Sequence, residues 1–109
     1  MNKCPNLCYE IFSADKTVAP RCFVTINDNK TVTAAKEGEE ILGYCVHVDD
    51  AGFATVKLTG YVEAPNIGVN KIGTVGLVVG NSPEKVVENK KATKYRVIYI
   101  GKDTIGFFL

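Results

Sequence analysis

Residues 41–63 read ILGYCVHV-DDAG-FATVKLTGYVE. Residues 41–48 and 53–63 predict two β-strands, and the polar segment at 49–52 predicts a tight turn between them. From Ala54 to Glu63, small or apolar residues alternate with residues that carry a polar group. A half-buried antiparallel strand has this period of two, because successive side chains point to opposite faces. The segment therefore predicts a β-hairpin, which sets the fold class and indicates no chemistry.

Each strand of this predicted hairpin contains one glycine, Gly43 in the first and Gly60 in the second. A glycine inside a strand marks a bend, a bulge or the close approach of another backbone or a ligand. No chemistry accompanies either residue in the sequence. We therefore interpret both as points where curved strands bend or pack in a small barrel.

Short strands separated by turns recur along the rest of the chain, without a convincing amphipathic helix and without an apparent repeat. Pro65 is expected to interrupt the strand that precedes it. The pattern predicts an all-β fold, a small single-domain β-barrel or sandwich of short antiparallel strands. The further strands that β-branched and aromatic content predicts lie at 21–26, 31–34, 74–79, 85–87, 95–100 and 104–109.

The 109 residues suffice for one domain. Residues 1–20 are punctuated by proline and polar residues and predict an extended N-terminal arm, which leaves residues 21–109 for the barrel or sandwich. Terminal segments are poorly ordered unless they dock on something. We expect this arm to dock, either on its own domain or on a neighbour, through its apolar residues, which are Leu7, Tyr9, Ile11 and Phe12.

Charge and hydropathy narrow the class of partner. Thirteen basic and twelve acidic residues give a formal net charge of +1, which argues against nucleic acid as the main partner, since that binding needs a basic face. No apolar run approaches the ~20 residues of a membrane span, so no membrane association is predicted. The N-terminus lacks the apolar core of a secretory signal, which favours residence in a cytoplasm.

Cysteine and histidine are the residues most able to carry chemistry here. The four cysteines are Cys4, Cys8, Cys22 and Cys45, and their spacing lacks the second short pair of a zinc site. A nucleophilic pair of Cys45 with His47, the single histidine, would lack an orienting third group. Reduced thiols that pack as small apolar groups are the favoured interpretation. We therefore predict no catalytic residue, no cofactor and no metal, and the chain is not expected to be an enzyme.

The strand at 39–45, the acidic turn with Gly52 and the segment ATVKLTGYVE at 54–63 resemble a family of small all-β capsid decoration (head stabilisation) proteins of tailed phages. The resemblance extends from about Thr31 to Val79 and consists mostly of glycines and valines. It implies a virion structural protein without catalysis. Such a protein is made in the host bacterial cytoplasm, then binds the outside of the capsid lattice and stabilises it.

The resemblance also implies the major capsid protein as partner and a homo-oligomer, with a trimer as one arrangement. A phage tail or head–tail component and a small β-barrel ligand-binding module are the alternatives. For the second alternative, Tyr44, Tyr61, Tyr95 and Tyr99 offer aromatic surface for a sugar or a peptide. The side chains expected at the capsid or oligomer interface come from the arm and the C-terminal strand: Leu7, Tyr9, Ile11, Phe12, Phe107, Phe108 and Leu109.

Overall fold

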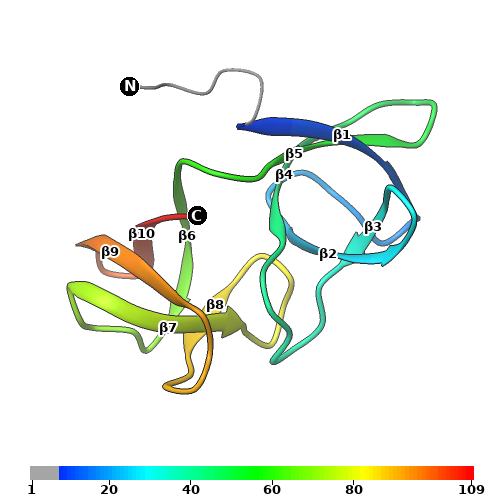
Figure 1. The fold of residues 1–109 in the computed structure, drawn as a ribbon. Helices are drawn as coiled ribbons and strands as arrows, with labels where there is room; N and C mark the ends of the chain where they lie inside the picture. Colours follow the sequence, from blue (N-terminus) through cyan, green and yellow to red (C-terminus); the bar gives the residue numbers. More distant parts are fainter. Residues whose placement is uncertain (1–7) are drawn as a thin grey trace.

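A computed structural model describes residues 8–109, and this part of the chain contains ten β-strands and no helix (Figure 1). The all-β prediction is confirmed. The strands are β1 Tyr9–Ala14, β2 Phe23–Asp28, β3 Thr31–Ala34, β4 Gly43–Val48, β5 Phe53–Lys57, β6 Tyr61–Ile67, β7 Gly73–Val79, β8 Val86–Glu88, β9 Lys94–Ile100 and β10 Thr104–Phe108.

These strands close into two small barrels that follow one another along the chain (Figure 1). The first barrel has the strand order β1-β3-β2-β4-β5 and the second has the order β10-β6-β8-β7-β9. Closure removes the unpaired edges that an open sheet of this size would expose. The predicted small β-barrel is therefore confirmed, and it occurs twice, each barrel being about half the chain.

The two barrels share one connectivity. In each, the first strand pairs in parallel with the third and antiparallel with the fifth. The second strand pairs antiparallel with the third and the fourth, and the fourth pairs antiparallel with the fifth. The structure thus contains an internal repeat of fold, which the sequence analysis missed.

The match between the barrels extends to irregular details. The fourth strand of each carries a bulge, at Val46 in β4 and at Ile98 in β9, where one extra residue shifts the register with the fifth strand. The same backbone bond also closes each barrel. Leu58 N donates to Cys8 O at 2.7 Å in the first barrel, and Leu109 N donates to Gly60 O at 2.9 Å in the second. Aligned positions in the two barrels can therefore be compared directly.

The long second strand predicted for residues 53–63 is wrong in one respect, because it is two strands. β5 ends at Lys57 in the first barrel and β6 begins at Tyr61 in the second, so residues 58–60 form the connection. Gly60 adopts a φ of 115°, which a residue with a Cβ rarely adopts. The alternation of residues continues across the break, and this is why the sequence suggested one strand.

Residues 9–14 correct the prediction of an N-terminal arm. Tyr9–Ala14 is β1, which pairs along its length with β5 and at its end with β3, so it is a wall of the first barrel. Phe12 points into the core of that barrel and is 7% exposed. Leu7 lies outside the described residues.

Pro65 lies inside β6 rather than ending it. It stands opposite Thr104 of β10, and the next residue, Asn66, pairs with Val86 of β8. Proline has no N–H for a ladder bond, so it is tolerated where a strand changes its pairing partner.

Two cores lie inside the barrels, and one aromatic residue joins them. Phe23 begins β2 of the first barrel, yet its side chain belongs to the core of the second. Its ring centroid lies 6.1 Å from that of Phe107 and 5.2 Å from that of Tyr44. Its backbone N–H donates to Pro83 O, on the loop between β7 and β8, at 2.6 Å. The barrels are therefore packed against each other through a shared aromatic cluster.

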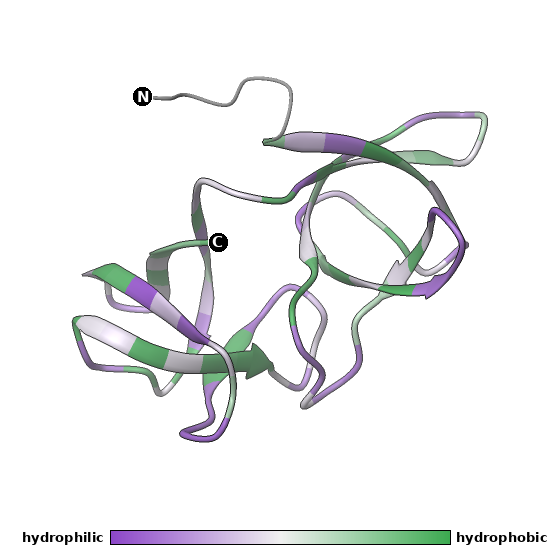
Figure 2. Ribbon diagram, viewed as in Figure 1, coloured by the Kyte–Doolittle hydropathy of each residue, from purple (hydrophilic) through white to green (hydrophobic). Residues whose placement is uncertain are grey.

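The loop between β3 and β4 also holds the barrels together. Gly38 N donates to Val79 O at 2.8 Å, and Val79 N donates to Glu39 O at 3.1 Å, so the loop lies along the end of β7. Figure 2 shows that this end of β7 is hydrophobic, and its last five residues are buried without alternation. A strand covered on both faces has this pattern, which explains the run of apolar residues at 75–79.

Candidate functional site

The outward surfaces of the two barrels carry most of the large exposed apolar side chains, and they differ in character. We use two names for them. The first-barrel face is the outward side of β1 and β5, with Tyr9, Ile11 and Phe53. The aromatic platform is the outward side of β6, β10 and β9, with Tyr61, Phe108 and Tyr99.

On the first-barrel face, Ile11 is 58% exposed and Phe53 is 45% exposed. Ile11 stands opposite Thr55, and Phe53 stands opposite Ser13, so the two apolar side chains are diagonal neighbours across β1 and β5. Contiguous exposed apolar side chains mark interaction surfaces more often than isolated ones do. Sequence reasoning selected Ile11 and missed Phe53, because Phe53 was assigned only to the hairpin.

The interface residues predicted from the sequence are divided by the structure. Tyr9 and Ile11 are exposed on the first-barrel face, and Phe108 is exposed on the aromatic platform. Phe12 and Phe107 are instead core residues, and Leu109 is half-buried against the second core. A run of apolar residues at the end of the sequence does not show which of them point into the core. This is why Phe107 was predicted at an interface.

The aromatic platform is built on a residue without a side chain. A Cβ placed on Gly106 would lie 2.0 Å from Tyr61 Oη and 2.7 Å from Tyr61 Cζ, so the Tyr61 ring lies directly over this glycine. The Tyr61 and Phe108 ring centroids are 5.4 Å apart. Tyr99 stands opposite Gly106 on the other neighbouring strand. The Tyr61 ring thus covers this bare backbone position beside the tilted ring of Phe108, while the Tyr99 ring lies against Gly101.

Polar groups border the platform. Tyr61 Oη donates to Glu63 Oε2 at 2.8 Å, and this hydrogen bond to a carboxylate raises the pKa of Tyr61 above its usual range. Arg96 stands opposite Phe108. The sequence offered Tyr44, Tyr61, Tyr95 and Tyr99 as an aromatic surface, but Tyr44 and Tyr95 are half-buried against the second core.

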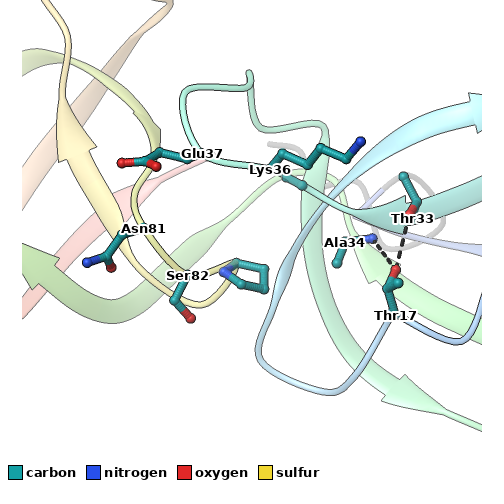
Figure 3. Close-up of a pocket in the computed structure, with 9 residues that line it drawn as sticks. Thr17, Thr33, Ala34, Lys36, Glu37, Asn81 and Ser82 are labelled. Atoms are coloured by element: carbon teal, nitrogen blue, oxygen red, sulfur yellow. Dashed lines mark hydrogen bonds between the residues drawn. The ribbon is translucent and has the colours of Figure 1, made fainter.

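A hollow of about 360 Å³ lies between the barrels and is lined by Thr17, residues 33–37 and residues 81–83 (Figure 3). The side chains of Lys36 and Glu37 extend in different directions from the loop, and their charged ends do not converge on one point (Figure 3). A small polar ligand needs a few convergent polar groups. The geometry of the hollow therefore gives it no particular ligand chemistry.

A hydrogen-bond network at the edge of this hollow ties the segment after β1 to β3. Thr17 Oγ1 donates to Asp15 Oδ1, accepts from Ala34 N at 3.0 Å and lies 3.1 Å from Thr33 Oγ1 (Figure 3 draws the last two). Thr17 N also donates to Asp15 Oδ1 at 2.9 Å. Hydrogen bonds hold the pKa of Asp15 below its ordinary value of 3.8. The largest contribution comes from the Thr17 hydroxyl, followed by the Thr33 hydroxyl and the Thr17 N–H.

This network gives a prediction about acid stability. Because the pKa of Asp15 is lowered by folding, its contribution is present above pH 3.8 and is lost as the pH falls through the lowered pKa. Asp15→Ala is expected to destabilise the protein by no more than about 1 kcal/mol at pH 7, since the carboxylate is solvent-screened. Urea unfolding at pH 7 and at pH 2 measures this, and the difference from wild type should shrink at pH 2. Asp50→Ala in the turn at 49–52 is the control, and an equal loss there would contradict the prediction.

The two buried thiols are placed for packing. Cys22 and Cys45 both lie in the first core, and burial raises the pKa of each thiol. Cys45 Sγ lies 3.6 Å from the backbone carbonyl of His47, to which it donates, while the His47 side chain is exposed beyond the bulge. A thiol with a raised pKa is a poor nucleophile at neutral pH. The geometry therefore does not bring the imidazole to the thiol as base.

Within residues 8–109, no group of three or more His, Cys, Asp or Glu is arranged to hold a metal ion. The same residues include no helix long and apolar enough to cross a membrane. No protein-family model matches this chain, and the search of curated proteins also gives no match.

Proposed function

We propose that this protein is a virion structural protein that binds the outside of a phage capsid lattice and stabilises it, with the major capsid protein as its partner. The first-barrel face is the observation that supports the proposal most directly. This face presents three large exposed side chains on two adjacent strands, those of Tyr9, Ile11 and Phe53. Burying such a patch against a partner removes apolar surface from water, at roughly 25 cal/mol per Å².

The architecture favours a role in rigid docking. Both barrels are closed, and the aromatic cluster around Phe23 packs one against the other. A partner surface pre-organised in this way loses little conformational freedom on binding. The resemblance of residues 31–79 to capsid decoration proteins gives the proposal its particular partner, and assembly as a homo-oligomer on the lattice is part of the proposal.

Cosedimentation with capsids tests the proposal. The capsids are assembled from a tailed-phage major capsid protein, and saturable occupancy is expected. The double variant Ile11→Ser/Phe53→Ser should lower occupancy at least about tenfold, since two apolar contacts of about 1 kcal/mol each are removed. Both residues are exposed, so the fold should be retained.

The matched control is Ile26→Ser. Ile26 is exposed on β2, which is not adjacent to β1 or β5 in the first barrel. Occupancy of this variant should equal that of wild type. Absence of saturable binding by the wild-type protein would refute capsid attachment, and equal loss in the control would refute the assignment of the face.

A further inference from the structure

The two buried cysteines of the first barrel stand opposite each other on neighbouring strands. β2 and β4 pair antiparallel, with Phe23 opposite Tyr44. The next pair in this register is Cys22 with Cys45, and Cys45 N donates to Cys22 O at 2.9 Å. Opposite residues of antiparallel strands have Cα atoms about 4.5–5.5 Å apart, and a disulfide needs about 4.4–6.8 Å. The backbone therefore holds Cys22 and Cys45 at the spacing of a disulfide.

A bulge just before β2 leaves both thiols inside the barrel. Arg21 N donates to Cys45 O at 2.7 Å, so Arg21 and Cys22 together stand opposite Cys45. Arg21 has a φ of 72°, the left-handed conformation that the first residue of one type of bulge adopts. Cys22 and Cys45 both belong to the first core, where they are 4% and 0% exposed. Burial, and after it the charge of the neighbouring Cys22, raises the pKa of Cys45, so the two thiols are close enough to interact.

The architecture that the barrels share does not require this pair of thiols. Cys45 directly precedes the bulge of β4 as Val97 directly precedes the bulge of β9, so the two residues are equivalent. The residue opposite Val97 on the second strand of its own barrel is Gly73. The second barrel thus closes without a sulfur atom at either position. Packing of a barrel with this connectivity therefore does not by itself explain the thiol pair.

We propose that Cys22 and Cys45 are a site of disulfide formation, with a low-molecular-weight disulfide such as oxidised glutathione as the oxidant. Cys22 follows an exposed segment at 19–21, and local opening of this segment brings its thiol to solvent. The Cys22 thiolate attacks one sulfur of oxidised glutathione, and the first glutathione leaves as a thiolate. Cys45 Sγ then gives up its hydrogen bond to His47 O, loses its proton and attacks the Cys22 sulfur of the mixed disulfide. The second glutathione leaves, so two electrons and two protons have passed from the cysteines to two glutathione molecules.

The disulfide ties β4 to the residue that precedes β2 and encloses β3 in the loop between them. A cross-link of this kind restricts the unfolded chain and so stabilises the folded one. Burial raises the pKa of both thiols, which makes exchange slow at neutral pH. The thiols therefore persist in a reducing cytoplasm, and the disulfide accumulates in an oxidising medium. The inference does not depend on capsid binding.

Incubation of the folded protein with oxidised glutathione tests the inference. A pH of about 8.5, near the ordinary pKa of a thiol, supplies the thiolate. After alkylation and digestion with trypsin, non-reducing mass spectrometry should find the peptide of residues 22–30 joined to that of residues 37–57, with the loss of two hydrogens. The oxidised protein should melt roughly 10 °C higher than the reduced protein. Dithiothreitol should reverse both changes.

Cys45→Ser is the matched control, because it keeps Cys22 but removes its partner. This variant should give no joined peptide of residues 22–30 and 37–57 and no rise in melting temperature. If it fails to fold, Cys22→Ser serves the same purpose from the other side of the pair. Absence of the joined peptide in the wild-type protein, or linkage of residues 22–30 to residues 4–16 in its place, would overturn the inference. An oxidised protein that melts no higher than the reduced one, or an equal rise in the control, would overturn it as well.

Discussion

Phe23→Ala is expected to destabilise the protein by about 3–5 kcal/mol, a large part of the roughly 5–15 kcal/mol that holds a domain folded. Phe23 is fully buried, and its ring stacks on Phe107 at an interplanar angle of 28°. Truncation removes the ring and leaves a cavity where the barrels meet, bordered by Tyr44. Two rigid barrels relax poorly into such a cavity, so the cost should fall in the upper part of this range.

Thermal and urea unfolding, followed by circular dichroism, measure this effect. The melting temperature should fall by roughly 10–20 °C. Ile26→Ala changes an exposed residue of the same strand and should stay within about 0.5 kcal/mol of wild type. A Phe23→Ala variant as stable as this control would show that the aromatic cluster does not hold the barrels together.

Deletion of residues 2–14 is expected to abolish cooperative unfolding. It removes β1, which pairs with β5 on one side and β3 on the other, and so opens the first barrel. Ala54 and Val56, both fully buried on β5, would then be exposed to water. The second barrel should also lose stability, because an unfolded first barrel no longer holds Phe23 in its core.

Deletion of residues 2–7 is the matched control, since it retains all ten strands. Its melting temperature should equal that of the full chain. The comparison separates the loss of β1 from the loss of the residues that precede it. If the protein without residues 2–14 unfolded cooperatively at the wild-type temperature, β1 would be dispensable and the barrel closure described above would be refuted.

Strand positions could be predicted from the sequence because each strand carries its own local signal. Valine-rich and aromatic segments at 74–79 and 95–100 correspond to β7 and β9, and residues 31–34 are β3. The polar turn at 49–52 separates β4 from β5 as expected. Propensity and alternation are properties of neighbouring residues, and this information is present in one sequence.

The division into two barrels could not be predicted, because it depends on pairing between distant strands. Nothing in the alternation from Ala54 to Val62 marks the change of barrel, apart from Gly60 and its positive φ. The repeat was also concealed, since aligned positions carry different residues, such as Thr55 and Gly106 or His47 and Tyr99. Burial of Phe107 beside an exposed Phe108 likewise requires the register of β10.

Of the candidate site, the sequence indicated the rings but not their arrangement. Four tyrosines were proposed as one aromatic surface, and only Tyr61 and Tyr99 are on it. Phe108 was expected at a contact, and Glu63 and Arg96 carried no signal by themselves. The one available indication in the sequence was Gly106, two residues before Phe108. A glycine in a strand gains this meaning only when the neighbouring strand is known.

The matched bulges and closing hydrogen bonds have an evolutionary consequence. Duplication and fusion of a gene for one barrel would produce two units with the same connectivity, the same extra residue in the fourth strand and the same closing bond. After such a fusion, one copy is free to diverge while the other preserves the older role. Under that origin, threonine in the first barrel and glycine at the aligned position of the second would record the divergence of the two copies.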